Sequence, residues 1–435
     1  MEIESKQPNS KASLQRGRRK VFVGMSGGVD SSVAAFLLSS GGGSLPVRQA
    51  GAFGGKKEGY DVTGVFINGF NVDGCSERDA EDARRVADHL GIPFYVIDAR
   101  EDYFEYVVQY MIKGYKEGLT PNPDVMCNKE IKFGIFLDKA LKLGADYIAT
   151  GHYIRLRRND EFPISNFQIN SKLQIKNDEN FEKIFSLLEA KDLNKDQSYF
   201  LWTLTQEQLK HCLFPIGEYT KPEVREIAKK AKLPTAEKKD SQGICFLGKV
   251  KLPEFLKEYI KPKKGDVLDT EGYKIGEHEG AQFYTIGQRH INIQHTTHNK
   301  RQGTNQRPYY VAEKDIKKNV LIAAEGDTHP ALFKKEITLT DVHFINEENH
   351  SLIRANRRIE VLVRVRYRQP LVRAMLVIGN KESVTSKGRK LPVTSYQLLF
   401  SEPIKFIAPG QSAVFYSIDV DKNGNHEMLG GGIIL

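Results

Sequence analysis

Apolar and amphipathic segments alternate along the first half of the chain. The short apolar runs have the length of buried strands, and the longer stretches between them repeat their apolar positions with a helical period. Strands and helices that alternate at this spacing predict a doubly wound parallel sheet, an α/β fold, which we place at residues 20–252. The predicted strands are residues 21–25, 61–67, 93–98 and 146–150, and the predicted helices are residues 31–39, 80–90, 103–115 and 129–143.

The pattern changes after about residue 250. Short alternating runs, such as residues 359–367 and 371–378, follow one another between turns rich in Gly, Pro, Asn and Asp. Regularly spaced short strands of this kind indicate antiparallel β domains. We therefore predict two small, mostly β domains: a central one at residues 253–332 and a C-terminal β-barrel at residues 333–435.

Three segments lack apolar periodicity. Residues 1–19 are rich in Lys and Arg and nearly free of apolar residues, which predicts a disordered basic tail. Glu2 and Glu4 argue against a mitochondrial transit peptide, a class poor in acidic residues. Residues 40–57 are Gly-rich and residues 160–180 are amide-rich, so both are predicted to be surface insertions.

Composition narrows the class of protein. The chain has 435 residues, 40% hydrophobic and 27% charged, which is typical of a globular protein with sizeable cores. No apolar stretch approaches the roughly 18 residues of a membrane span. Four cysteines are too few for a disulfide scaffold, and the absence of a CxxC pair argues against a structural zinc site. No signal peptide is visible in the sequence. We therefore expect reduced thiols and a cytoplasmic location. The net charge of +9 favours a polyanionic partner.

The strongest candidate for chemistry is the segment GMSGGVDSS at residues 24–32, between the first predicted strand and the first helix. Its glycines let the backbone approach an anion closely, and Ser26, Ser31 and Ser32 add hydroxyl donors. The N–H groups at the start of the following helix complete a phosphate cradle, although the Gly-Lys-Ser/Thr of a Walker loop is absent. A Gly-Ser turn without a ligand is the alternative.

Cys127 lies in TPNPDVMCNKE at residues 120–130, a proline-stiffened loop that opens a helix. A thiol near a helix N-terminus and beside Lys129 is expected to have a lowered pKa. Asp124, three residues earlier, is within reach as an acid or base. On spacing alone, an inert buried thiol is an equal alternative.

Cys245 lies in KDSQGICFLG at residues 239–248, after two lysines and between two glycines. A buried structural cysteine is again the alternative, and the sequence does not show whether Cys245 and Cys127 meet in space. Cys212 follows an amphipathic helix and is expected in the core, whereas Cys75 lies in a predicted loop. Neither of these two is given a role.

Several motifs together resemble known families. The loop SGGVDSS resembles the signature of the ATP pyrophosphatases, which cleave ATP to AMP and pyrophosphate. From about residue 20 to the C-terminus, the chain resembles the tRNA-specific 2-thiouridylases, which convert the 2-oxo group of the wobble uridine to 2-thio. That resemblance is carried by both cysteine segments, by ATGHY at 149–153, NKDQSYFL at 194–201, TIGQR at 285–289, RYRQ at 366–369 and PGQSAVFY near the end.

The resemblance implies a PP-loop domain that uses ATP and Mg²⁺. Isoleucine at position 67 departs from the methionine common in the family, which affects only an apolar contact with adenine. Asp30 would help to hold Mg²⁺ on the phosphates. The implied ATP contacts are Gly24, Met25, Ser26, Gly27, Gly28, Val29, Asp30, Ser31, Ile67 and Gly151.

The resemblance also implies a tRNA site. The substrates would be the tRNAs for Lys, Glu and Gln. Residues 351–373 contain seven Arg against one Glu, which fits binding to a polyanion. Asn122, Pro123 and Asp124 would face the target base, and Lys195, Asp196, Gln197, Arg366 and Tyr367 would contact tRNA.

The implied reaction has two stages. ATP first adenylates the 2-oxo group, and a persulfide sulfur carried by Cys245 then attacks the activated carbon. Cys127 closes a disulfide onto Cys245, or otherwise releases the sulfur, so that AMP leaves and 2-thiouridine remains. The sulfur would come from a cysteine desulfurase or from a sulfur-relay protein.

Two alternatives make different use of the cysteines. Other ATP pyrophosphatases, such as the GMP, argininosuccinate and lysidine synthetases, deliver nitrogen and need no cysteine pair. A non-catalytic RNA-binding protein on the same fold would not need Asp30, Asp124, Cys127 and Cys245, all of which are present.

Overall fold

The computed structural model describes most of the chain. The insertions predicted at residues 40–57 and 160–180, and the predicted tail apart from Arg18 and Arg19, lie outside the described residues. The described residues are 18–39, 60–72, 74–159, 184–240, 245–248, 250–289, 291, 293, 307–346, 357–384 and 390–435.

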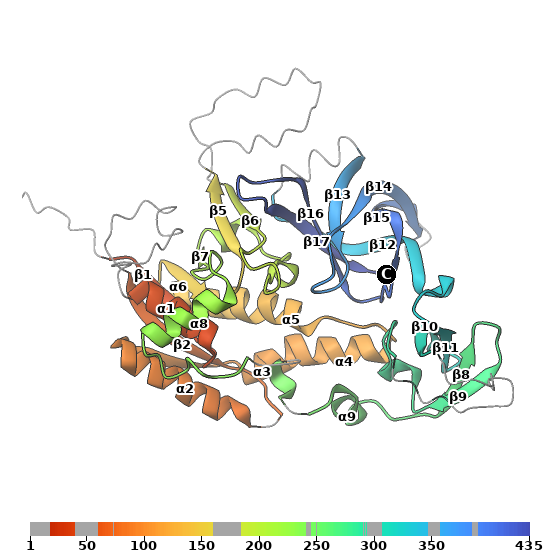
Figure 1. Ribbon diagram of the computed structural model, residues 1–435, viewed down its shortest axis with the longest axis horizontal. Coiled ribbons are helices and arrows are strands. Elements are labelled where there is room, and N and C mark those ends of the chain that lie inside the picture. Colours follow the sequence, from red (N-terminus) through yellow and green to blue (C-terminus); the bar gives the residue numbers. More distant parts are fainter. Residues whose placement is uncertain are drawn as a thin grey trace, which may run out of the picture.

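A parallel sheet forms the core of the N-terminal domain (Figure 1). Its strand order is β3-β2-β1-β4-β7, and all pairs are parallel, which confirms the predicted fold class. The strand β7 was not predicted because its two residues are too few to form a visible apolar run. Cys212, which was expected in the core, is fully buried in this strand. The strands are β1 (Lys20–Gly24), β2 (Asp61–Asn68), β3 (Phe94–Asp98), β4 (Tyr147–Thr150) and β7 (Cys212–Leu213).

The helices lie close to the predicted positions, with shifted ends. The helix predicted at 129–143 begins much earlier, because Asn122 caps it and Pro123 occupies its first position. π-helical turns at Phe104–Val108 and Cys127–Ile135 join α3 to α4 and α5 to α6. The helices are α1 (Val29–Ser39), α2 (Cys75–Leu90), α3 (Arg100–Tyr103), α4 (Gln109–Lys116), α5 (Pro123–Met126), α6 (Phe136–Lys142), α7 (Gln206–Leu209), α8 (Lys221–Lys230) and α9 (Leu252–Lys257).

A hairpin ties the N-terminal domain to the C-terminal one. Its strands, β5 (Arg155–Asn159) and β6 (Ile184–Leu188), flank the insertion predicted at 160–180. The strand β6 pairs with β17 (His426–Ile434) of the C-terminal domain, so the hairpin extends the sheet of that domain. The two domains therefore share backbone hydrogen bonds and not only side-chain contacts.

The central domain contains a four-stranded sheet of order β10-β11-β8-β9. The strands β11 and β8 run parallel, which departs from the antiparallel arrangement predicted for this region. Short strands alone do not reveal their direction, because the connections that set it are long here. The strands are β8 (Gly265–Asp269), β9 (Lys274–His278), β10 (Tyr309–Asp315) and β11 (Val320–Glu325).

The C-terminal domain is a closed barrel of antiparallel strands, as predicted. Pairing of β12 with β17 closes the sheet, and residues such as Val361, Leu376 and Phe415 fill its interior. The strands of the barrel are β12 (Phe333–Phe344), β13 (Arg358–Arg364), β14 (Val372–Val384), β15 (Lys390–Lys405), β16 (Ser412–Val420) and β17. Short 3₁₀ turns lie at Ser198–Phe200, Cys245–Leu247, Ala281–Phe283 and Pro330–Leu332.

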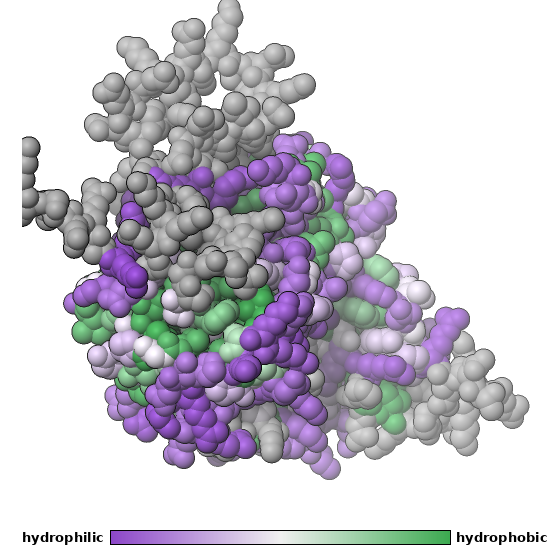
Figure 2. All heavy atoms as spheres, turned by 60° about the vertical axis from the view of Figure 1, so that its left-hand side comes forward, coloured by the Kyte–Doolittle hydropathy of each residue, from purple (hydrophilic) through white to green (hydrophobic). Residues whose placement is uncertain are grey.

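One face of the molecule is hydrophobic at its centre. In Figure 2, hydrophobic side chains gather in the middle of the view and hydrophilic ones lie above and below them.

None of the described helices combines the length and the apolar character needed to cross a bilayer.

Candidate active site

Hydroxyl groups fix the loop between β1 and α1. The Ser26 N–H donates to Ser31 Oγ at 3.1 Å, and Ser31 Oγ donates to the Gly28 carbonyl at 3.2 Å. Ser32 Oγ donates to the same carbonyl at 2.7 Å. These bonds hold the loop against the first turn of α1, where free N–H groups and the positive end of the helix dipole favour an anion.

Two glycines of this region have no room for a side chain. Gly27 has φ +71°, and a Cβ there would lie 2.2 Å from the Asp79 carbonyl oxygen. A Cβ on Gly151 would lie 2.6 Å from the Ser31 nitrogen. The loop after β4 therefore packs directly against the start of α1 because position 151 is a glycine.

The predicted ATP contacts come from three neighbouring strands. Gly24 ends β1, Ile67 lies at the end of β2, and Gly151 follows β4. The strand order reverses at β1, which pairs with β2 on one side and with β4 on the other. Ligands of open α/β sheets bind at the carboxyl ends of the strands beside such a reversal. The structure thus brings the predicted nucleotide-binding residues together.

Asp30 lies in the first turn of α1, and two groups donate to its carboxylate. Lys221 Nζ lies 2.7 and 2.8 Å from its two oxygens, and the Tyr153 hydroxyl donates to one of them at 2.8 Å. Within the described ranges, no group of three or more His, Cys, Asp or Glu side chains is placed to hold a metal ion. A carboxylate and phosphate oxygens are the ligands that Mg²⁺ prefers, so Asp30 remains a predicted ligand of a metal carried by ATP.

Asn122 and Pro123 start the helix that carries Cys127. The Asn122 side chain accepts hydrogen bonds from the N–H groups of Asp124 at 3.2 Å and Val125 at 3.3 Å. Pro123 has no N–H to satisfy at the first helical position. Cys127 follows one turn later, inside the continuous helix and not at its N-terminus.

The predicted low pKa of Cys127 is wrong for this structure. Burial raises the pKa of the thiol, Lys132 opposes the rise only in part, and Asp124 adds to it. Lys129, the expected source of positive charge, is exposed and pairs with Glu130. Burial also raises the pKa of Asp124 against the effect of Lys132. The thiol is therefore protonated at neutral pH, and a carboxyl with a raised pKa suits an acid or a base.

Tyr103 connects Cys127 to the segment that begins at Cys245. Its hydroxyl donates a hydrogen bond to the Cys127 sulfur, and its ring centroid lies 5.8 Å from that of Phe246. The Phe246 carbonyl accepts from the Val72 N–H at 3.1 Å. One buried apolar cluster thus contains Cys127 and the residue that follows Cys245. Sequence reasoning missed Tyr103 because it is one of several aromatic residues on an amphipathic helix.

We expect Tyr103→Phe to raise the pKa of Cys127 further. The hydrogen bond from Tyr103 lowers the thiol pKa, and phenylalanine removes the bond while keeping a ring beside Phe246. The pH of half-maximal alkylation by iodoacetamide should rise, read from the mass of the peptide that contains Cys127. Tyr115→Phe is the control, since Tyr115 lies in the same cluster but bonds to Thr285. An unchanged or lower alkylation pH in Tyr103→Phe would contradict this role.

The residues predicted to contact tRNA at positions 195–197 have different surroundings. Lys195 is partly exposed and pairs with Asp240 at 2.7 Å. Asp196 is 2% exposed and accepts from Arg364 of the barrel at 2.9 Å. The Gln197 side chain accepts from a backbone N–H of the loop after β4 at 2.9 Å. In this conformation, Lys195 offers a charged group to a partner, whereas Asp196 and Gln197 hold the loop in place.

The barrel residues predicted to contact tRNA lie where the barrel meets the other two domains. Arg366 is half-buried and donates to the Ile286 carbonyl at 3.0 Å, and burial lowers its pKa. The Tyr367 ring packs against Phe200 with centroids 4.5 Å apart. Arg368, the third residue of the RYRQ motif, is exposed, and its guanidinium carbon lies 5.2 Å from the centroid of the Tyr367 ring.

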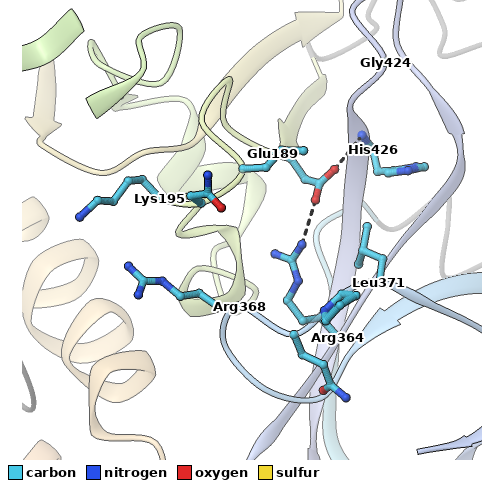
Figure 3. Close-up of a pocket in the computed structure, with 11 residues that line it drawn as sticks. Glu189, Lys195, Arg364, Arg368, Leu371, Gly424 and His426 are labelled. Atoms are coloured by element: carbon cyan, nitrogen blue, oxygen red, sulfur yellow. Dashed lines mark hydrogen bonds and ion pairs between the residues drawn. The ribbon is translucent and has the colours of Figure 1, made fainter. Parts of the chain in front are cut away.

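A cavity of about 530 Å³ lies between the N-terminal domain and the barrel (Figure 3). Glu189 and Arg364 pair inside it at 3.1 Å. Lys195 and Arg368 also line the cavity, from two loops, and Figure 3 shows their side chains extending in the same direction. Their charged ends offer two cations on one side of the cavity, a suitable arrangement for a nucleic-acid backbone.

If Arg368 contacts a tRNA phosphate, Arg368→Ala should make affinity less dependent on salt. The slope of log affinity against log salt should become shallower by about one unit, because one fewer counterion is released on binding. Filter binding between about 50 and 200 mM salt measures the slope. Arg373→Ala is the matched control, since Arg373 lies in the same arginine-rich segment but pairs with Glu360 at 2.9 Å. Equal slopes for Arg368→Ala and the unmodified chain would contradict the contact.

Family models match the chain in three successive parts. They are described as a tRNA methyl transferase HUP domain at residues 19–249, a tRNA methyl transferase PRC-barrel domain at 253–325 and an aminomethyltransferase beta-barrel domain at 334–434. Among solved structures, the NMN synthetase of Francisella tularensis aligns with 52% of this chain and 67% of its own, with a TM-score of 0.27 and 14% sequence identity.

Curated relatives match nearly the whole chain. The tRNA-specific 2-thiouridylase MnmA of Streptococcus sanguinis is 40% identical over 424 residues, 95% of each chain. The tRNA-specific 2-thiouridylase MnmA 1 of Geobacillus kaustophilus is 42% identical over 409 residues, 93% of this chain and 94% of its own. The corresponding protein of Idiomarina loihiensis is 38% identical, with 97% of both chains covered. Similarity of this extent shows that the chain belongs to the tRNA-specific 2-thiouridylase family.

Proposed function

We propose that this chain is an ATP-dependent tRNA 2-sulfurtransferase. It adenylates the 2-oxo group of the wobble uridine and replaces the oxygen with sulfur, giving 2-thiouridine, AMP and pyrophosphate. The observation that carries the proposal is the contact of Tyr103 with both Cys127 and Phe246, because it gathers the two cysteine segments in one cluster. The nitrogen-transferring synthetases do not need such a pair, and the family of the chain also argues against them.

ATP would bind at the carboxyl ends of β1, β2 and β4. The N–H groups of Gly24 through Ser31 would hold the phosphates at the start of α1, Gly151 would allow the close approach, and Ile67 would contact adenine. Mg²⁺, when bound through the phosphates and Asp30, would offset the negative charge of the departing pyrophosphate. Of the residues proposed to face the base, Asn122 and Pro123 form the helix start and Asp124 lies directly after them.

Sulfur transfer uses the two cysteines in different roles. The terminal sulfur of a persulfide on Cys245 attacks C2 of the adenylated uridine, and AMP leaves with the oxygen. The Cys127 thiolate then attacks the Cys245 sulfur, which breaks the S–S bond to the substrate and leaves 2-thiouridine and a Cys127–Cys245 disulfide. A thiol reductant restores both thiols. Because burial keeps Cys127 protonated, a base must take its proton first, and Asp124 is the nearby candidate.

The partners follow from this chemistry. The tRNAs for Lys, Glu and Gln are the proposed substrates. Lys195 and the arginine-rich part of the barrel would bind them. The persulfide sulfur would come from a cysteine desulfurase or a sulfur-relay protein. A chemistry that needs reduced thiols and tRNA fits the cytoplasm, which is the proposed location.

Nucleoside analysis of modified tRNA tests the proposal. The full chain is incubated with unmodified tRNA, ATP, Mg²⁺ and a persulfide donor, and the anticodon nucleosides are analysed by mass spectrometry. We expect a mass gain of sulfur for oxygen at the wobble uridine, together with AMP. Formation of an aminated nucleoside, or of no modified nucleoside while tRNA is bound, would overturn the proposal in favour of nitrogen transfer or of simple RNA binding.

A further inference from the structure

The phosphate loop has no lysine of its own, and the fold supplies one from a distant part of the chain. We propose that Lys221 binds the β- and γ-phosphates of ATP. The proposal rests on the proposed function for the identity of the nucleotide. Lys221 is the first residue of α8, and α8 packs against α1, the helix that follows the phosphate loop.

The Lys221 ammonium is already held at the loop. Its side chain is 10% exposed. Nζ lies 2.7 and 2.8 Å from the two Asp30 oxygens and 2.8 Å from Asp240 Oδ1. An ammonium has three N–H donors, and these contacts use all of them. Its charge therefore lies beside the side chain of Asp30, a residue of the first turn of α1, where the phosphates would bind.

Other cations lie close to Lys221 and share one of its carboxylate partners. Asp240 is shared with Lys195 and Arg225, each at 2.7 Å. Burial alone would raise the pKa of Asp240, but hydrogen bonds from Lys195 and Lys221 outweigh it and lower the pKa well below its usual range. Three cations, Lys195, Lys221 and Arg225, thus gather at one carboxylate, Asp240. Cations gathered in this way suit a site that receives a polyanion, because a phosphate oxygen can take the place of a carboxylate oxygen at Nζ.

The backbone of Lys221 is fixed independently of its side chain. Thr220 and Glu223 form a capping box at the start of α8, and Pro222 lies in its first turn. The Lys221 N–H donates to Asp192 at 2.9 Å. Replacing the side chain of Lys221 therefore leaves the helix start intact, so the charge can be removed without loss of the cap.

A purely structural role makes a different prediction. If Lys221 only joined Asp30 to Asp240, its loss would disturb the loop for every nucleotide, including AMP. If it binds the outer phosphates, its loss weakens the binding of nucleotides that carry those phosphates and leaves the binding of AMP unchanged. Binding of AMP and of the non-hydrolysable analogue α,β-methylene-ATP separates the two roles without any catalytic turnover.

The experiment compares dissociation constants by isothermal titration calorimetry. Lys221→Met should bind α,β-methylene-ATP about ten- to a hundredfold more weakly than the unmodified chain, as expected for one charge-assisted hydrogen bond. Its AMP affinity should change less than about threefold. Lys221→Arg should recover most of the analogue affinity. Lys229→Met is the control on the same helix, since Lys229 is exposed and pairs with Glu237, and it should bind both nucleotides normally.

Either of two results would overturn the proposal. One is an equal loss of AMP and analogue affinity, which would make Lys221 a structural link; the other is unchanged analogue affinity. If Lys221→Met does not fold, Lys221→Gln keeps a hydrogen-bond donor without the charge and is measured in the same way. Failure of the proposed function has a separate signature: the unmodified chain would bind the analogue through Lys221 but form no 2-thiouridine.

Discussion

Cys245→Ser should abolish formation of 2-thiouridine while ATP-dependent adenylation of tRNA continues. A serine hydroxyl cannot carry a persulfide sulfur, whereas the nucleotide site at the ends of β1, β2 and β4 does not include position 245. Labelled persulfide sulfur, supplied by a cysteine desulfurase or another persulfide donor, should therefore leave no label on the variant, and AMP should still appear attached to tRNA. Mass spectrometry of the protein and of tRNA nucleosides measures both results.

Cys127→Ser should fail at a later step. Sulfur should load on Cys245, but 2-thiouridine should not be released, because no second thiol can break the S–S bond to the substrate. In the unmodified chain, a Cys127–Cys245 disulfide should accumulate during turnover without reductant and disappear with dithiothreitol. The Cα atoms must then come within about 7 Å of each other.

A matched cysteine tests whether the effect is specific. Cys212 is fully buried in β7 and its sulfur donates to the Gln208 carbonyl at 3.0 Å, a bond that a serine hydroxyl can also make. Cys212→Ser should therefore retain thiolation. Normal thiolation by Cys245→Ser, or labelled sulfur on Cys75 or Cys212, would refute the assigned roles.

The phosphate loop was visible in the sequence because its parts are local, whereas Ile67 and Gly151 came only from the family resemblance. Glycines and serines between a buried strand and a helix predict a phosphate cradle, and the structure has that loop at the reversal of the sheet. Lys221 could not be found in this way, because 191 positions separate it from Asp30. No local pattern marks a lysine at the start of a helix as the partner of a distant loop.

The thiol environment shows a second limit of sequence reasoning. Lys129 lies only two positions after Cys127, but residues two apart on a helix do not face each other. Lys132 is the cation that acts on the thiol, and burial, which depends on tertiary packing, outweighs it. Tyr103 reaches Cys127 only because two helices pack together. The residue types were predictable, whereas the pKa and its causes were not.

Asp30→Ala should abolish the release of AMP and pyrophosphate and leave tRNA affinity nearly unchanged. Alanine removes the carboxylate proposed to help position the metal and the phosphates, and it releases Lys221 from one of its two partners. The fold should persist because Asp240 still pairs with Lys221. Affinity for tRNA should persist because Arg368 lines a cavity at the barrel and makes no contact with Asp30 or its partners Lys221 and Tyr153.

Nucleotide products and tRNA binding are measured on the same preparations to separate these effects. Asp98→Ala is the control: Asp98 ends β3 at the same edge of the sheet, but it is exposed and pairs with Arg100 at 2.7 Å, so AMP release should continue. A parallel loss of tRNA affinity in Asp30→Ala would mean that the phosphate loop and the tRNA surface are not independent. Release of ADP in place of AMP by the unmodified chain would exclude cleavage between the α- and β-phosphates, and with it the role proposed for the loop.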